Sequence, residues 1–439
     1  MKLDKKQGKV KKLSRSQKEA IGLLQIGTFL EYFDLMLYVH MAVLLNELFF
    51  PETDSRTASF IAAFTFCSTY IFRPFGALLF GWIGDNMGRK AAIIISTFMM
   101  ALSCFFMTII PTYEQVGLLA SVMMIGCRVL QSLSATGEVI GAEIYLTETL
   151  DPPASYQAVS WIAEICTLGG VAALFITSVI LECQVGWRAV FMLGGMIAFS
   201  GALARTKLRE TSAFLKAKTQ KSQGVLIEEV SVAKKTFWAY FFIYAGFPLC
   251  FYWVYIYGAN ILKHSMGYDI KQITHHNLVL TILSFVVGIL LILMAKTIPP
   301  LKILRIRAII FGVLVVISVP FVPFTTNIYA LYTMLVLLTV SCLGTTPAIS
   351  IFFQHFPVTK RFTYSSMLYA VTRALMYVVT SFGLLYLIDV FGSYGLWVIM
   401  LPMTFGFLWG VRHFEKLESL VASKKHSPFV NTLRIQAVS

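Results

Sequence analysis

Ionisable and amide side chains lie within apolar stretches of this sequence, where they could bind a polar solute. Arg128, Gln131 and Glu138 fall inside an apolar stretch from about 115 to 145. Helical spacing places these side chains on one stripe of a helix. Charged groups in a membrane span are costly, and those that are retained normally face a water-filled pathway. The spacing therefore predicts a polar pathway between helices, with Arg128 and Gln131 as contacts for the solute.

A second set of polar side chains lies in the first apolar segment. Glu31, Asp34 and Tyr38 are separated by three and four positions, so they also share one helical face. A membrane carboxylate near an arginine can exchange a proton, because desolvation favours its neutral form and the cation favours its charged form. We predict that Asp34 or Glu138 carries a proton, that Glu31 is a further candidate, and that Tyr38 contacts the solute.

Three arginines bear on these predictions. A permanent ion pair with Arg128 or Arg73 is the alternative to proton exchange by the carboxylates. Arg373 lies in a later apolar segment, with Tyr369 and Tyr377 one turn away on either side. Arginine binds carboxylates through two parallel hydrogen bonds, so we predict that Arg373 and the two tyrosines contact an anionic group opposite Arg128. The alternative for Arg373 is a contact with a helix-end carbonyl.

Aromatic residues form a stripe in the segment that starts near residue 237. The stripe consists of Tyr240, Tyr244, Phe247, Phe251 and Tyr255. Such a wall could hold a quaternary ammonium group by cation–π contact, and Phe251 and Tyr255 are our candidates for that contact. Packing or an interfacial aromatic belt is the alternative interpretation.

The composition indicates how these side chains are positioned. Hydrophobic residues make up 57% of the 439 residues and charged residues 13%, which is more apolar surface than a soluble fold can bury. We therefore predict an all-α, multi-pass membrane protein. About twelve apolar segments are long enough to cross a bilayer. They are 20–45, 58–84, 91–110, 115–147, 157–182, 187–205, 237–262, 274–295, 302–322, 327–352, 364–388 and 392–412.

One long polar interruption divides these segments into two groups of six. The predicted parts are a basic tail (1–19), a first six-helix half (20–206), a linker (207–236), a second six-helix half (237–413) and a short tail (414–439). Lysine and arginine concentrate in the first tail, the linker and one short turn, which predicts that both termini are cytoplasmic. The net charge of +14 is then explained by basic residues in cytosolic segments that lie beside an anionic membrane leaflet. We therefore expect no nucleic-acid partner.

A glycine-rich turn joins the second and third segments. It contains Gly81, Asp85, Gly88, Arg89 and Lys90. Glycine permits a tight turn and close helix approach, while the acid can pair with a base or with a helix end. We predict that this turn is a gate that holds the cytosolic ends of the two halves together. A simple basic hairpin is the alternative.

This turn resembles the signature loop of the major facilitator superfamily. Further motifs resemble those of its metabolite:proton symporter family, which includes proline/betaine, 2-oxoglutarate and shikimate carriers. They are Gly27 to Tyr38, the run Arg73-Pro74-Phe75-Gly76, the segment from Arg128 to Glu148, and Gly186-Trp187-Arg188. Arg73 joins the predicted gating set. The resemblance is dense over about residues 20–200, although Tyr32, Ser132 and Thr136 depart from the family pattern.

The resemblance implies a major facilitator fold of twelve transmembrane helices and a proton-coupled symporter. Such a protein would import a small carboxylate-bearing or zwitterionic metabolite by alternating access between its two halves. We expect it to function as a monomer in the cell (inner) membrane, with protons and a small molecule as partners. The substrate could be proline/betaine-like or an oxo or dicarboxylic acid.

Other functional classes have less support. We expect no enzyme activity, no metal site and no cofactor, because the sequence contains no nucleophile–base pair and no cluster of metal ligands. A channel is disfavoured because no filter-like loop interrupts the segments. The remaining alternative is a transporter-like nutrient sensor that binds its ligand without translocating it. The intact set of charged residues argues against this sensor.

Overall fold

A computed structural model describes residues 13–50, 70–182, 186–223, 232–321 and 327–425. The described residues form helices and connecting turns, without strands. Backbone groups in a bilayer core must satisfy their hydrogen bonds within the protein, which leaves helices or closed barrels as the possible folds. The all-α class is confirmed.

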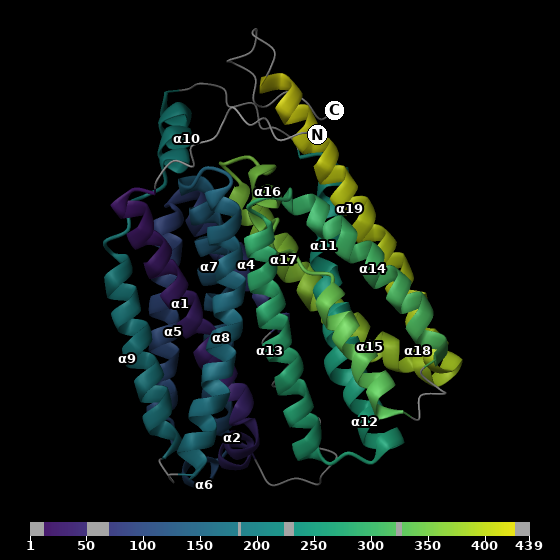
Figure 1. The fold of residues 1–439 in the computed structure, drawn as a ribbon. Helices are drawn as coiled ribbons and strands as arrows, with labels where there is room; N and C mark the ends of the chain where they lie inside the picture. Colours follow the sequence, from purple (N-terminus) through teal and green to yellow (C-terminus); the bar gives the residue numbers. More distant parts are fainter. Residues whose placement is uncertain (1–12, 51–69, 183–185, 224–231, 322–326, 426–439) are drawn as a thin grey trace.

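The helices before the linker form what we call the first half. They are α1 (Arg15–His40), α2 (Ala42–Phe49), α4 (Arg73–Asn86), α5 (Arg89–Ile109), α6 (Tyr113–Val116), α7 (Leu118–Thr149), α8 (Ala154–Glu182) and α9 (Trp187–Arg205). The linker contains α10 (Ser212–Ser222), whose N-cap Thr211 accepts a hydrogen bond from the Phe214 amide. Figure 1 shows the first half in purple and blue on one side of the molecule, with α10 at one end of the bundle.

The helices after the linker form the second half. They are α11 (Lys234–Phe251), η1 (Tyr252–Tyr257), α12 (Gly258–Met266), α13 (Ile270–Met294), α14 (Pro300–Phe321), α15 (Ile328–Ser341), α16 (Ile349–Gln354), α17 (Arg361–Val378), η3 (Val379–Gly383), α18 (Leu384–Phe391), η4 (Gly392–Tyr394) and α19 (Gly395–Lys425). Elements η1 and η3 are π-helical, and η4 is a 3₁₀ turn. The C-terminal end of α19 lies at the same end of the bundle as α10 (Figure 1).

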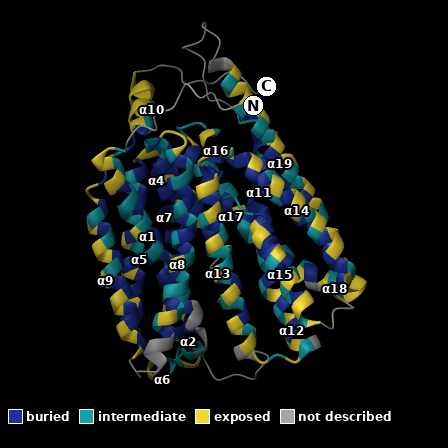
Figure 2. Ribbon diagram, viewed as in Figure 1, coloured by how far each residue is buried: buried dark blue, intermediate teal, exposed yellow. Residues whose placement is uncertain are grey.

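Nine of the described helices are long and apolar enough to cross a membrane. The predicted count of twelve also includes 58–84, of which residues 58–69 lie outside the described part. It includes 327–352 as well, where non-helical residues separate α15 from α16, and 364–388, which the structure divides among α17, η3 and α18. Large apolar side chains such as Leu118, Phe175 and Phe405 are exposed. Figure 2 shows exposed residues along the helices at the outside of the bundle, as expected for a surface that faces lipid.

Glycines allow close helix contacts inside the bundle. A Cβ atom at Gly76 would lie 2.5 Å from the Leu133 carbonyl oxygen, and one at Gly169 would lie 2.3 Å from the Phe29 carbonyl oxygen. These contacts bring α4 against α7 and α8 against α1, and α4 also packs along α17 of the second half. Small residues permit such backbone approach in membrane bundles, so polar side chains on α1, α4 and α7 are brought together.

Candidate functional site

The polar stripes on α1 and α7 meet inside the first half. Arg128 Nη1 donates to Gln131 Oε1 at 2.7 Å, and Arg128 Cζ lies 3.8 Å from the centroid of the Tyr38 ring. Gln131 Nε2 reaches the Cys104 and Met107 sulfurs at 3.7 and 3.8 Å. The Tyr38 ring and the Gln131 amide together orient the Arg128 guanidinium. The geometry can therefore present Arg128 to an anionic group.

Two predicted proton carriers are enclosed without an ion pair among the described residues. Glu31 is 2% exposed and Asp34 is fully buried. Their carboxylate oxygens have no nitrogen or oxygen hydrogen-bond partner among the described residues. Asp34 lies beside the Cys104 thiol, and a Cβ atom at Gly194 would lie 2.3 Å from Asp34 Oδ1. Burying an ionised carboxylate without a partner is costly, so both groups are chemically suited to bind a proton.

The third predicted carrier, Glu138, has a partner that the sequence analysis missed. Arg205 Nη1 lies 2.6 Å from Glu138 Oε1, and both side chains are buried. Arg205 also donates to the Thr97 hydroxyl and to the Leu23 carbonyl. The expected alternative partners, Arg128 and Arg73, make no ion pair with Glu138 among the described residues. Arg205 is the last residue of an apolar segment, where a basic side chain normally extends to the membrane–water interface. Its position in the sequence therefore did not indicate a pairing with Glu138.

Arg373 lies among aromatic rings of the second half. Its Cζ is 4.5 Å from the centroid of Phe247 and 5.5 Å from that of Tyr369. Phe247, Phe251 and Tyr255 stack in sequence, with centroids 6.3 and 5.2 Å apart. The rings of Phe251 and Tyr377 are 6.5 Å apart, so part of the predicted aromatic stripe lies beside the Arg373 set.

Tyr70, which the sequence analysis did not single out, joins the two halves. Its ring centroid lies 4.2 Å from that of Tyr377 and 4.8 Å from Arg73 Cζ. Arg73 therefore lies beside the Tyr70 ring. It is the first residue of α4, at the opposite end of that helix from Asp85. The three arginines that could bind an anion therefore come from α4, α7 and α17, with tyrosine rings between the halves.

Glu143 is a further carboxylate that the sequence analysis missed. It is 6% exposed and forms no hydrogen bond or ion pair through its carboxylate in the described part of the chain. Its electrostatic neighbours are Arg373 on α17 and the stacked Tyr240 and Tyr244 on α11. The sequence feature that could have identified Glu143 is its position five residues after Glu138, because this spacing places the two side chains on different faces of α7. Glu143 thus faces the second half.

The predicted gate turn binds the second half directly. Asp85 Oδ1 and Oδ2 accept hydrogen bonds from the backbone amides of Phe362 and Thr363 at 3.0 and 2.9 Å. These amides belong to the first turn of α17, where free N–H groups and the helix dipole favour an anion. A Cβ atom at Gly81 would lie 2.8 Å from Thr363 Cα, and one at Gly84 would lie 2.3 Å from the Phe362 ring. Both glycines therefore permit this contact.

A buried ion network surrounds Asp85. Arg89 donates to Asp85 at 3.2 Å and to Glu148 at 3.0 Å. Glu148 also accepts from Arg361 of the second half at 2.9 Å and from the Thr211 hydroxyl at 2.6 Å. Glu148 is therefore shared by arginines from both halves. We call Asp85, Arg89, Glu148 and Arg361 the gate network.

The linker is attached to the same network. Glu210 accepts hydrogen bonds from the backbone amides of Arg89 and Lys90 at 3.1 and 3.2 Å, which caps α5. Gly88 precedes these amides with φ of 120°, and a Cβ atom there would lie 2.1 Å from Glu210 Oε2. Only glycine adopts this conformation readily and leaves room for the acid. Lys90 thus enters the contact through its backbone.

No group of three or more potential metal ligands occurs among the described residues. The chemistry of the site rests on arginines, carboxylates and aromatic rings. Such a set can bind an anionic or zwitterionic solute and exchange protons, and it contains no activated nucleophile.

Relatives and solved structures give a consistent assignment. Residues 24–381 match the family model of the Major Facilitator Superfamily. The chain is 30% identical over 215 residues to the proline/betaine transporter of Escherichia coli (strain K12), a match that covers 47% of this chain and 43% of the relative. It is 28% identical over 297 residues to the glycine betaine/proline/ectoine/pipecolic acid transporter OusA of Dickeya dadantii, covering 63% and 58%. The chain thus spans about half the length of the curated relatives it matches.

The fold also resembles solved transporters. The proton:xylose symporter XylE superposes with a TM-score of 0.73 at 12% identity, covering 91% of this chain and 95% of XylE. The transporter FucP in its outward conformation gives 0.72 at 13% identity, covering 91% and 99%. These relatives and neighbours are transporters rather than enzymes. The chain belongs to the major facilitator superfamily.

Proposed function

We propose that this protein is a proton-coupled symporter that imports a small carboxylate-bearing or zwitterionic metabolite by alternating access. The observation that carries the proposal is the pairing of an inter-half arginine and aromatic site with a closed gate network at the linker end. Transporters of this fold bind solute between their halves and expose it alternately to the two sides. A network that closes one end supports an outward-facing state.

The substrate class is inferred from the residues that would contact it. Arg128 and Arg373 suit a carboxylate, and the rings of Tyr38, Phe251 and Tyr377 suit an ammonium group or a flat apolar surface. A zwitterion such as proline or glycine betaine offers both groups. The names of the relatives from E. coli and D. dadantii support this class.

Proton coupling is assigned to Asp34 first. Its carboxylate is buried beside a thiol, whereas Glu138 already pairs with Arg205 at 2.6 Å. A fully paired carboxylate is held charged by its partner and exchanges a proton less readily. Glu31 and Glu143 remain further candidates, because both are buried without an ion pair in the described part of the chain.

The proposed topology has the linker, the gate network and both termini in the cytoplasm. The basic tail and linker support this orientation, since basic residues are retained on the cytoplasmic side. We further propose that the protein acts as a monomer in the cell (inner) membrane, with the bilayer, protons and a small molecule as its partners.

The test is uptake by purified protein in proteoliposomes with an acidic exterior. Labelled proline, glycine betaine, 2-oxoglutarate and shikimate are compared with and without a protonophore. We expect accumulation of at least one compound against its gradient, and loss of accumulation when the protonophore is present. Accumulation that follows a sodium gradient alone would overturn proton coupling. Specific binding without uptake would instead support a nutrient sensor.

A further inference from the structure

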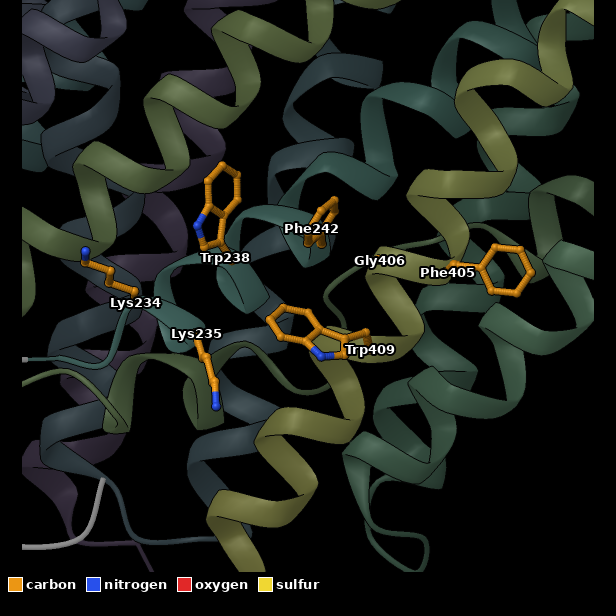
Figure 3. A pocket seen from close by; sticks show the side chains of 7 residues that line it. All are labelled: Lys234, Lys235, Trp238, Phe242, Phe405, Gly406 and Trp409. Carbon is orange, nitrogen blue, oxygen red and sulfur yellow. The ribbon is translucent and has the colours of Figure 1, made fainter. Parts of the chain in front are cut away.

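A groove outside the transport site lies between the linker-side parts of α11 and α19 (Figure 3). Its volume is about 520 Å³, and it opens to the outer surface of the second half. Lysines, tryptophans and phenylalanines line it. Gly406 lies at its floor, where a Cβ atom would be 2.3 Å from the Phe242 ring, so the hollow depends on this glycine.

The lining side chains are ordered along the membrane normal. On α11, Lys234, Trp238 and Phe242 recur every four residues from the linker side inward. On α19, which runs back toward the linker end, Phe405 is followed by Trp409 (Figure 1). On α11 the order is therefore lysine outermost, tryptophan next and phenylalanine deepest, and α19 repeats the order of tryptophan above phenylalanine. This order matches the headgroup, interface and acyl regions of one leaflet.

The outer end of the groove is electropositive. Lys234 and Lys235 are exposed and form no ion pair among the described residues. Among the residues that the structure describes, no acidic side chain lines the groove. The nearby acids of α19 point elsewhere, because Glu415 pairs with Arg305 on α14 and Glu418 contacts His355, each at 3.0 Å. Within the described part of the chain, an anion can therefore approach the two lysines without a competing carboxylate.

The inner end of the groove is apolar and exposed. Trp238, Phe405 and Trp409 are 57%, 68% and 42% exposed. The Phe242 and Trp409 rings contact edge to face, with centroids 6.2 Å apart, which fixes the wall of the groove. Such a surface suits an acyl chain, while the tryptophan indoles suit the interfacial region.

We propose that this groove is a binding site for an anionic phospholipid, with its phosphate at Lys234 and Lys235 and one acyl chain against Phe242 and Phe405. The lipid would belong to the cytoplasmic leaflet, a detail that rests on the proposed orientation. Charge complementarity selects the occupant, because a zwitterionic lipid would carry its own cation to the two lysines. The site is separate from the arginines proposed to bind substrate.

The test is tryptophan quenching by lipids with brominated acyl chains, in nanodiscs that contain the full chain. Brominated phosphatidylglycerol is compared with brominated phosphatidylcholine at low and high salt. We expect a preference for the anionic lipid on the order of tenfold, which weakens as salt screens the lysines. The double variant Lys234→Gln/Lys235→Gln should lose it. The matched variant Lys296→Gln/Lys302→Gln, which removes two exposed lysines at another turn, should keep it.

A further double variant locates the source of the fluorescence quenching. Trp238→Phe/Trp409→Phe should remove the quenching that distinguishes the two lipids, although five other tryptophans remain of the seven in the chain. The proposal is overturned if the parent shows no preference, if the preference survives in Lys234→Gln/Lys235→Gln, or if it survives in Trp238→Phe/Trp409→Phe. Displacement by soluble glycerol phosphate would show that the lysines bind free phosphate groups, which would also overturn the lipid assignment. Both leaflets carry the same lipid, so a failure here is independent of transport and orientation.

Discussion

Replacing Asp85 by Asn should open the gate network. The carboxylate accepts the Phe362 and Thr363 amides at 3.0 and 2.9 Å and the Arg89 guanidinium at 3.2 Å. Asn offers one acceptor oxygen instead of two, and its NH₂ group would face an N–H donor. The loss of one charge-assisted hydrogen bond costs about 2 kcal/mol. Because this contact requires the two halves to be closed at the linker end, the equilibrium should shift toward the open state by about thirtyfold.

The assay uses Ser366→Cys in a background without other cysteines. Ser366 is buried on α17, where its hydroxyl donates to the Phe362 carbonyl at 2.7 Å and lies 3.1 Å from the Ala77 carbonyl of α4, so a thiol there is accessible only when the halves separate. With Asp85→Asn, an impermeant maleimide added from the linker side should label this thiol about thirtyfold faster. The matched control is Glu114→Gln, which removes an exposed acid away from the network. Equal labelling in parent and variant, with normal transport, would refute the gate and leave the turn as a topology signal.

Three further predictions concern the interior charges. Asp34→Asn should abolish accumulation driven by a proton gradient while exchange of labelled substrate remains measurable, and normal accumulation would remove Asp34 as the carrier. Glu138→Gln should lower the free energy of unfolding by about 3 to 5 kcal/mol, because Arg205 would be left buried without its partner; an unchanged thermal transition in detergent would contradict this. Arg128→Lys should raise the apparent KM for a carboxylate substrate about tenfold or more, since lysine cannot form the planar fork, and unchanged kinetics would show that Arg128 is structural.

Some of the site could be predicted because helical periodicity relates neighbours along one helix. The contact of Arg128 with Gln131 follows from their three-residue spacing on α7. The stripe on α1 was likewise visible, but not that Glu31 and Asp34 would be buried without an ion pair among the described residues while Glu138 of α7 pairs with Arg205. That outcome depends on α9, where Arg205 lies against Gly27 of α1 and Gly194 lies against Asp34.

The sequence by itself determined the all-α membrane class and the presence of a tight glycine-rich turn. Hydropathy is sufficient to predict this fold class, because few backbone structures satisfy all their hydrogen bonds inside a bilayer. The turn could also be predicted, because its glycines permit a tight backbone conformation and its acid can pair with a nearby base or helix end.

Only the tertiary structure decided which charges are paired. Glu138 and Arg205 are 67 residues apart, and Glu148 and Arg361 are 213 apart. The energy of such a pair depends on distance and desolvation, which are set by the packing of helices across and between the two halves. A periodic pattern gives the face on which a charge lies along its own helix, but it carries no information about which distant helix that face will meet.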